Sequence, residues 1–100
     1  IDDLIEGIVT LMRSDLEGPV NIGSPEYVSI NDLVKAVCAV ANKQVHVNHI
    51  AGPIGVQSRN FSNARICSTG WRARYLLKEG IERTYPWIKQ QVEKSRNLER

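Results

Sequence analysis

The chain has 100 residues, of which 42% are hydrophobic and 24% are charged, and its formal net charge is +2. This length allows one domain at most, and this composition excludes an intrinsically disordered chain. No apolar run reaches the roughly 18 residues that a membrane-spanning helix needs, and no basic run is dense enough to indicate a nucleic-acid partner.

The charges are distributed unevenly along the chain. Residues 1–32 carry seven acidic side chains and one basic side chain, whereas residues 33–100 carry twelve basic and four acidic side chains. Acidic and basic side chains are interspersed, which favours a solvated surface. The chain begins with Ile1 inside an apolar pattern, so we expect it to be a piece of a longer protein.

The first helix is predicted from the spacing of its apolar residues. One face is formed by Leu4, Ile5, Ile8, Val9 and Met12. Asp2 and Asp3 favour the start of this helix because they lie at the positive end of its dipole. Gly7 weakens the helix, so it predicts close packing against a neighbouring segment. Residues 17–19 end the helix, and the alternation over residues 19–23 predicts a short strand.

A second helix is predicted to begin at Ser29. The Ser29 hydroxyl can accept a hydrogen bond from the amide of Asp32, and the Asp32 carboxylate can answer, as in a capping box. The apolar face of this helix consists of Ile30, Leu33, Val34, Val37, Cys38 and Ala41. Residues 45–50 then alternate as in a half-buried strand. His46 and His49 would point to opposite faces of that strand, so they suit surface positions better than a metal site.

A last helix is predicted from about Leu76. Its apolar face consists of Leu77, Ile81, Tyr85, Ile88 and Val92. Pro86 lies inside this pattern and lacks a backbone donor, so it is expected to kink the helix or split it in two. A short helix over residues 64–69, capped by Ser62 or Asn63, precedes it. The expected fold class is therefore α/β: a single domain over residues 1–100 with three main helices, a short one, and two to four short strands.

The loop from Gly52 to Trp71 contains the strongest candidate for ligand binding. Gly55 lets the backbone turn, and Arg59 offers donors in a planar fork that matches phosphate oxygens. The first amides of the short helix also favour an anion. An arginine bound to a nearby carboxylate or to solvent is the alternative. Gly23 and Ser24, at the end of the first predicted strand, form either a second lining of the site or an ordinary turn.

No complete catalytic set occurs in the chain. A glycine-rich nucleotide fingerprint, a serine–histidine–carboxylate set and a pair of carboxylates near an apolar pocket are all missing, so the chain alone is expected to be inactive and to hold no metal. Cys38 is expected to be a buried free thiol, in preference to a disulfide or a metal pair with Cys67, which fits a cytoplasmic protein. Trp71 and Trp87 are expected in the core or at a domain interface.

Several stretches occur together in one order: IDDLIEGIVTLM, PVNIGSPEYVSINDLV, GPIGVQSRN, TGW and LKEGIERTYPWIKQQVEK. Together they resemble the carboxyl-terminal part of the extended short-chain dehydrogenases/reductases, the family of NAD-dependent nucleotide-sugar epimerases and dehydratases. Each motif is short, but the resemblance covers nearly the whole chain. Their order and spacing together are therefore fairly specific.

The resemblance implies an amino-terminal Rossmann domain outside this chain, which carries the glycine-rich NAD loop and a Tyr-x-x-x-Lys pair. That domain would perform transient oxidation of the sugar, epimerisation and re-reduction, while this chain binds the substrate. By this resemblance Arg59 holds the nucleotide diphosphate. The further substrate-binding residues that it implies are Gln57, Asn60, Asn21, Gly23 and Ser24. The full enzyme is expected to be a homodimer, and the chain by itself to self-associate through the apolar surface that meets the Rossmann domain.

Because the sequence departs from the family at two positions, the resemblance does not identify the sugar or the base of the nucleotide-sugar substrate. Epimerases of this kind typically carry an arginine where Gln57 stands, and a Leu-Gly-Trp sequence where this chain has Thr69-Gly70-Trp71. A dehydratase, decarboxylase or reductase of the same superfamily is therefore an alternative. A free-standing, non-catalytic binding domain is another, and the residues upstream of this chain would separate these possibilities.

Overall fold

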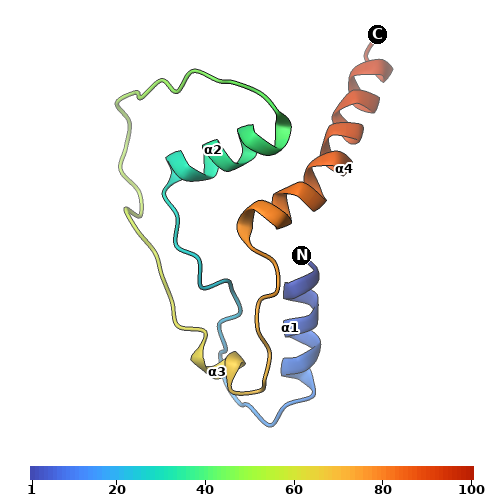
Figure 1. The fold of residues 1–100 in the computed structure, drawn as a ribbon. Helices are drawn as coiled ribbons and strands as arrows, with labels where there is room; N and C mark the ends of the chain where they lie inside the picture. The colour runs from blue at the N-terminus through green and yellow to red at the C-terminus, as the bar shows by residue number, and fades with distance from the viewer. The chain divides into compact units, whose positions relative to one another are not determined.

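The structure is a computed structural model that describes all residues from 1 to 100. Its regular elements are four helices, α1 (Asp2–Met12), α2 (Ile30–Ala41), α3 (Ala64–Cys67) and α4 (Leu77–Leu98), joined by irregular segments (Figure 1). The chain divides into two compact units. Unit 1 contains Ile1–Tyr27 and His46–Arg74, and unit 2 contains Val28–Val45 and Tyr75–Arg100.

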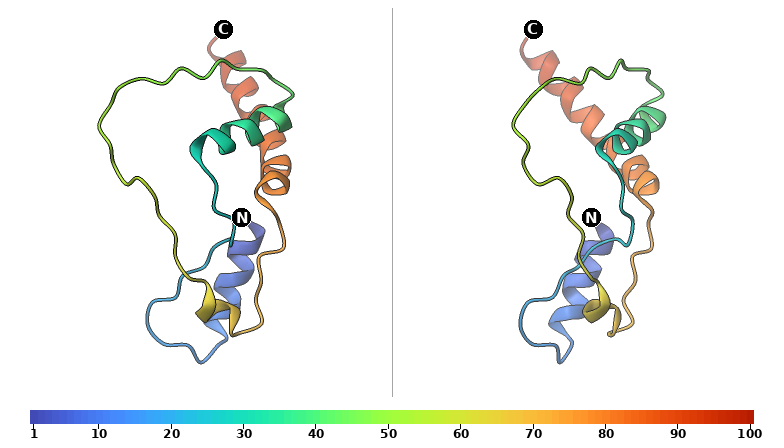
Figure 2. Two further views of the ribbon diagram at one scale, coloured as in Figure 1. Left: turned by 60° about the vertical axis from the view of Figure 1, so that its left-hand side comes forward. Right: turned by 90° about the vertical axis from the view of Figure 1, so that its left-hand side faces the viewer.

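The predicted α/β fold class is wrong, because the chain contains no β-strand. The segments expected to be strands, residues 19–23 and 45–50, are irregular, and every residue of the second segment is exposed. Both views of Figure 2 draw the connection between α2 and α3 as an extended ribbon without a strand arrow. Alternating apolar residues favour an extended backbone, but a strand also needs a neighbour whose N–H and C=O groups complete the ladder. No segment of this chain provides that neighbour.

Helix α1 of unit 1 begins where the sequence predicted, but it ends at Met12, before residues 17–19, which were predicted to end it. It spans Asp2–Met12 and has its acidic side chains in the first turn, as expected. Its apolar face is largely uncovered, with exposed fractions that run from 39% at Val9 to 79% at Met12. Beyond the helix, Gly18 turns the chain with a φ of 76°. This left-handed conformation costs glycine nothing, whereas a side chain would strain it.

The core of unit 1 consists of Ile66 and Trp71, whose exposed fractions are 0% and 6%. The prediction of a core position for Trp71 is confirmed. Gly7 of α1 packs closely against its neighbours, as the sequence predicted. A Cβ atom on Gly7 would lie 2.8 Å from Cγ2 of Ile22 and 3.2 Å from the Trp71 ring. The absence of a side chain therefore lets α1 approach the core.

Unit 2 is built from α2 and α4, which pack against each other. Ser29 caps α2 by accepting a hydrogen bond of 3.1 Å from the amide of Asp32, so this half of the predicted capping box is confirmed. Ile30 and Val37 remain exposed, although they were predicted on the apolar face. The half-buried residues of the two helices are Leu33, Val34, Ala36, Cys38, Val40, Ala41, Leu77, Gly80, Ile81, Tyr85 and Gln91.

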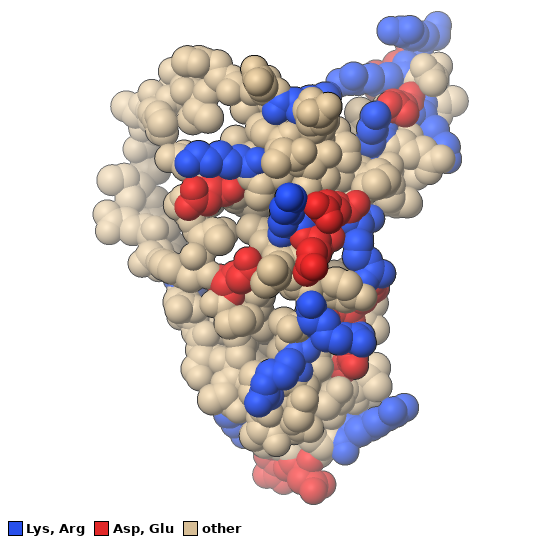
Figure 3. Space-filling view, viewed as in Figure 1, with Lys and Arg blue, Asp and Glu red and all other residues tan.

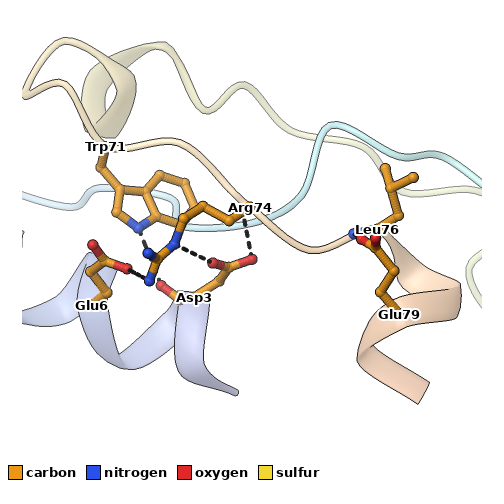
Figure 4. A network of polar contacts seen from close by, with 6 residues as sticks. All are labelled: Asp3, Glu6, Trp71, Arg74, Leu76 and Glu79. Atoms are coloured by element: carbon orange, nitrogen blue, oxygen red, sulfur yellow. Dashed lines mark hydrogen bonds and ion pairs between the residues drawn. The ribbon is translucent and has the colours of Figure 1, made fainter. Parts of the chain in front are cut away.

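Helix α4 runs unbroken from Leu77 to Leu98, although Pro86 lies inside it. The predicted split does not occur, because one lost backbone hydrogen bond leaves the other bonds of a 22-residue helix in place. At its start the Glu79 carboxylate accepts a hydrogen bond of 2.8 Å from the amide of Leu76 (Figure 4). Trp87 is 65% exposed, so it does not lie in a core within this chain. None of the four helices is both long and apolar enough to cross a membrane.

Candidate functional site

The residues predicted to bind the substrate all lie in unit 1, on two segments without regular secondary structure. They are Asn21, Gly23 and Ser24, which follow α1, and Gln57, Arg59 and Asn60, which precede α3. Gly23 is half-buried and the other five are exposed. Since no strand or helix fixes either segment, side-chain contacts must set their positions.

The two segments meet at Gly23. A Cβ atom on Gly23 would lie 2.9 Å from Cε2 and 3.0 Å from Cζ of Phe61, and 3.6 Å from Oδ1 of Asn63. Phe61 directly follows Asn60, so this contact brings the end of the second segment against the first. Any larger residue at Gly23 would push the aromatic ring away. The structure thus joins two candidate segments that are far apart in the sequence.

Arg59 is exposed and makes no hydrogen bond or ion pair with another residue of the chain. The alternative in which a nearby carboxylate binds Arg59 is therefore not realised in this structure. The guanidinium keeps all of its donors available for phosphate oxygens or for water. Gln57, two residues earlier, is exposed as well.

Asn60 and Ser24 have local roles in addition to any contact with a ligand. Oδ1 of Asn60 accepts a hydrogen bond of 2.9 Å from the amide of Phe61. The hydroxyl of Ser24 accepts one of 3.1 Å from the amide of Glu26. The Ser24 contact spans two residues and stabilises a turn of the kind that serine favours, whereas the Asn60 contact reaches only the next residue. The side-chain NH₂ group of Asn60 remains free to donate to a ligand.

Helix α3 is shorter than predicted and adds less to anion binding than expected. It spans Ala64–Cys67, whereas the sequence predicted a helix as far as Thr69. The hydroxyl of Ser62 already accepts a hydrogen bond of 3.2 Å from the amide of Ala64. A single helical turn also aligns few peptide dipoles. The short helix therefore adds little to the predicted anion site, whose one full positive charge among the predicted residues is that of Arg59.

Arg65, which the sequence analysis did not single out, fixes the chain just before Asn21. Its Nη1 atom donates a hydrogen bond to the carbonyl of Pro19 and its Nη2 atom donates one to the carbonyl of Glu17, both at 2.7 Å. The partners are 46 and 48 residues apart in the sequence. No local spacing rule connects residues so distant, so the sequence contained no signal for this contact.

A second group of contacts connects α1 with the segment after α3 (Figure 4). Arg74 forms an ion pair with Glu6, and its backbone amide donates a hydrogen bond of 2.9 Å to the carboxylate of Asp3. The indole N–H of Trp71 donates one of 3.2 Å to the Asp3 carbonyl. The sequence did contain a signal here, because Asp3 and Glu6 share a face of an acidic helix and residues 33–100, which include Arg74, carry an excess of basic side chains. These carboxylates contribute to the packing of unit 1.

The remaining charged side chains behave as a solvated surface. Figure 3 shows acidic and basic side chains next to one another on the face it presents. In the ion pair of Lys35 with Asp32, the two side chains are 79% and 60% exposed, so the pair contributes little to stability. Hydrogen bonds with the side chains of Ser29 and Lys35 hold the pKa of Asp32 below its ordinary value.

The Tyr-x-x-x-Lys spacing, which the family resemblance assigned to the Rossmann domain outside this chain, also occurs inside it. Tyr85 and Lys89 are four residues apart on α4 and therefore match Tyr-x-x-x-Lys; Tyr85 is half-buried and Lys89 is exposed. No glycine-rich fingerprint accompanies the pair in these 100 residues, so it lacks the loop that holds a dinucleotide. Cys38 and Cys67 are both free thiols, so the preference for a free Cys38 is confirmed, but Cys38 is half-buried and not buried as predicted.

The chain is similar to known nucleotide-sugar enzymes. It is 44% identical over 97 residues to GDP-mannose 3,5-epimerase of Arabidopsis thaliana, a match that covers 96% of this chain and 26% of that protein. It is 38% identical over 87 residues to putative GDP-L-fucose synthase 2 of Oryza sativa subsp. japonica, covering 85% and 25%. It is 25% identical over 99 residues to UDP-glucuronic acid decarboxylase 1 of Danio rerio, covering 97% and 24%.

The chain spans about a quarter of the length of the curated relatives it matches. No family model and no solved structure matches it. The resemblance predicted from the sequence motifs is confirmed, since the chain is similar to the carboxyl-terminal part of extended short-chain dehydrogenase/reductase epimerases.

Proposed function

We propose, from the similarity of this chain to GDP-mannose 3,5-epimerase, that it is the substrate-binding part of a nucleotide-sugar epimerase and holds the diphosphate of the substrate. The observation that carries this proposal is 44% identity over 96% of the chain. The contact between Gly23 and Phe61 supports it, because Phe61 lies two residues after Arg59 and the contact connects both candidate segments.

Arg59 would supply most of the attraction for the diphosphate. Hydrogen bonds between a guanidinium and a phosphate are charge-assisted and can form in pairs, which fixes orientation as well as affinity. Gln57 and the NH₂ group of Asn60 would add neutral donors from the same loop. The segment of residues 21–24 would approach from the other side, where Gly23 leaves room for the loop. Binding the diphosphate in this way would direct binding energy toward the sugar, where the reaction occurs.

The residues of this chain do not fit an NAD site. Such a site needs a glycine-rich turn between a strand and a helix, whereas α3 follows Phe61-Ser62-Asn63 and no strand precedes it. We therefore place NAD in the part of the enzyme that lies outside this chain, where it would supply reversible oxidation of the sugar. The role of this chain is to bind the substrate and to orient it.

Replacement of Arg59 tests the proposal. In the full-length protein, Arg59→Ala is expected to weaken the binding of GDP by about 1.5–3 kcal/mol, because a charged hydrogen bond to phosphate is lost. That loss corresponds to a dissociation constant roughly 10- to 150-fold higher, which isothermal titration calorimetry measures directly.

Arg96→Ala is the matched control for this experiment. Arg96 is also exposed, but it lies on α4 in unit 2 and carries none of the predicted contacts. Its replacement should leave the affinity for GDP unchanged, which separates the specific role of Arg59 from the general effect of one lost positive charge. Equal affinities of the wild type and Arg59→Ala would contradict the proposal.

A reductase or decarboxylase of the same superfamily is the second candidate. The similarity to the putative GDP-L-fucose synthase and to the UDP-glucuronic acid decarboxylase favours it, as does the glutamine at position 57. The bound nucleotide separates the candidates. A preference for UDP over GDP of about tenfold or more in titrations would favour a decarboxylase. Conversion of GDP-mannose to an isomer of the same mass would favour the epimerase.

A further inference from the structure

We propose that Arg65 is a positioning residue that holds the substrate-binding segment of residues 21–24 in place. The inference rests on the proposed function, since it assumes that this segment borders the substrate. Arg65 itself lies on α3, beside the fully buried Ile66. A contact made from α3 therefore starts from the best-packed point of unit 1.

The geometry of the Arg65 contact suits this role. The two carbonyls that the guanidinium binds belong to Glu17 and Pro19, which flank Gly18. Gly18 has a φ of 76°, and a Cβ atom placed on it would meet no atom within 4 Å. Glycine is the most flexible residue of the backbone, so this position is a natural hinge. By binding one carbonyl on each side of the hinge, the planar guanidinium fixes the direction in which the chain leaves Gly18.

The chain beyond this hinge has little else to fix it. No backbone–backbone hydrogen bond involves residues 19–24. Apart from the local hydrogen bond between the Ser24 hydroxyl and the amide of Glu26, two further contacts join them to distant residues: Ile22 lies against Gly7, and Gly23 lies against Phe61. Both contacts are apolar and lack the directionality of a hydrogen bond. Arg65 therefore supplies the directional restraint that sets where Gly23 meets Phe61.

Arg72 provides a matched control. Like Arg65, it donates hydrogen bonds to two carbonyls: its Nη1 atom donates to those of Cys67 and Trp71, at 2.7 and 2.8 Å. Both partners lie within five residues of Arg72, so this contact stabilises the turn after α3 and does not reach residues 17–24. Both arginines thus donate hydrogen bonds of similar length to two backbone carbonyls, Arg65 from two terminal nitrogens and Arg72 from one, but only Arg65 contacts the residues that flank Gly18.

The first readout requires no ligand. Because Gly23 lies at the edge of the Phe61 ring, its NMR signals should carry a ring-current shift, which Phe61→Leu identifies by removing it. In full-length protein with labelled glycine, Arg65→Met should also remove this shift, whereas Arg72→Met should preserve it. An unchanged Gly23 signal in Arg65→Met would overturn the inference, whatever the ligand is.

The second readout is binding and turnover. Arg65→Met should raise the dissociation constant of GDP, and KM for GDP-mannose, about tenfold, since a small displacement of a binding segment has effects of this size or larger. The value of kcat should change less than KM, because the segment binds the diphosphate and does not contact the reacting atoms. Arg65→Lys should restore part of the affinity, since an ammonium group can still donate to a carbonyl.

The remaining outcomes separate this inference from the proposed function. If GDP binds and Arg59→Ala weakens it, but Arg65→Met does not, the inference fails and the proposed function stands. Equal losses in Arg65→Met and Arg72→Met would indicate general destabilisation and also overturn the inference. If the wild type binds no nucleoside diphosphate, the proposed function fails, and the Gly23 signal alone then decides whether Arg65 fixes the segment.

Discussion

Units 1 and 2 are stabilised in different ways. Unit 1 contains every buried residue of the chain, namely Gly7, Ile66 and Trp71, although α1 is its only helix of more than one turn. Unit 2 contains the two longest helices, and neither has a buried residue. The two longest helices and the buried residues therefore occur in different units of this molecule.

The difference shows which contacts the candidate site depends on. In unit 2 the backbone groups are satisfied within each helix, so local sequence is sufficient to form the elements. In unit 1 the segments are irregular, and contacts between distant residues hold them, such as those of Arg65 with Glu17 and Pro19. Because the predicted substrate-binding residues all lie in unit 1, we expect the site to be sensitive to single substitutions of these long-range contacts.

The largest effect is expected when the buried tryptophan is removed. Trp71→Ala should reduce the free energy of unfolding by about 3–5 kcal/mol, since it empties the centre of unit 1 and removes the hydrogen bond of the indole to Asp3. Trp87→Ala is the control. Its side chain is 65% exposed, so its loss should change the free energy of unfolding by about 0.5 kcal/mol or less. Urea unfolding of both variants measures the difference.

Equal losses of stability in the two tryptophan variants would contradict this contrast between the units. The fluorescence of single-tryptophan proteins gives an independent check. Trp71 should emit at shorter wavelength than Trp87, because its ring is shielded from water. An emission of Trp71 as red as that of Trp87 would show that the core of unit 1 is open to solvent.

An intermediate effect, with opposite signs in the two units, is expected for glycine-to-alanine substitutions. Gly80→Ala in α4 should stabilise by about 0.5–1 kcal/mol, because its new methyl group meets no atom within 4 Å and alanine favours a helix. Gly7→Ala in α1 gains the same propensity, but its Cβ atom would lie 2.8 Å from Ile22 and 3.2 Å from Trp71.

Overpacking of this kind costs about 1–3 kcal/mol, so Gly7→Ala should be destabilising in balance. The neighbouring Cγ2 atom belongs to a β-branched side chain and the ring of Trp71 is buried, so neither can move away easily. Denaturant unfolding of the two variants measures the change in the free energy of unfolding, which should be positive for Gly80→Ala and negative for Gly7→Ala. If Gly7→Ala stabilises the protein as much as Gly80→Ala does, α1 does not approach the core as the structure shows.

The same contrast explains which parts of the fold could be predicted from the sequence. Helix α2 was predicted nearly to both ends, and α1 and α4 were predicted at their first residues, because apolar spacing and the cap at Ser29 are local signals. The strands predicted over residues 19–23 and 45–50 do not form. Alternation of apolar residues says nothing about a pairing partner elsewhere in the chain. Of the two effects predicted for Pro86, the split is wrong, since the turns on either side of it continue the helix, and the kink stays a prediction.

In the candidate site, too, some residues could be recognised from the sequence, whereas the contacts between distant residues could not. The residue types at Arg59 and Gly23 could be singled out from the sequence, because their chemistry is visible in one residue and its neighbours. Two contacts depend on the three-dimensional path of an irregular chain: Gly23 packs against Phe61, and Arg65 donates hydrogen bonds to the carbonyls of Glu17 and Pro19. No periodicity encodes that path, so those contacts were found only in the structure.

The smallest effect is expected at the cap of α2 in unit 2. Ser29→Ala removes the acceptor for the amide of Asp32 and should cost about 1 kcal/mol. It also removes the stronger of the interactions that lower the pKa of Asp32, so this pKa should rise toward its ordinary value. A lowered pKa in the folded state stabilises the fold above the pKa of the unfolded chain, and this contribution is lost as pH falls through the folded pKa.

The difference in stability between the wild type and Ser29→Ala should therefore be largest near neutral pH and smaller in acid, below the ordinary pKa of Asp32. Unfolding at both pH values, with an NMR titration of Asp32, measures this dependence. Ser95→Ala is the matched control, because Ser95 is an exposed serine inside α4, where alanine is the better helix former. If Ser29→Ala proves as harmless as Ser95→Ala at every pH, local capping does not define the start of α2, and unit 2 depends on the packing of its helices instead.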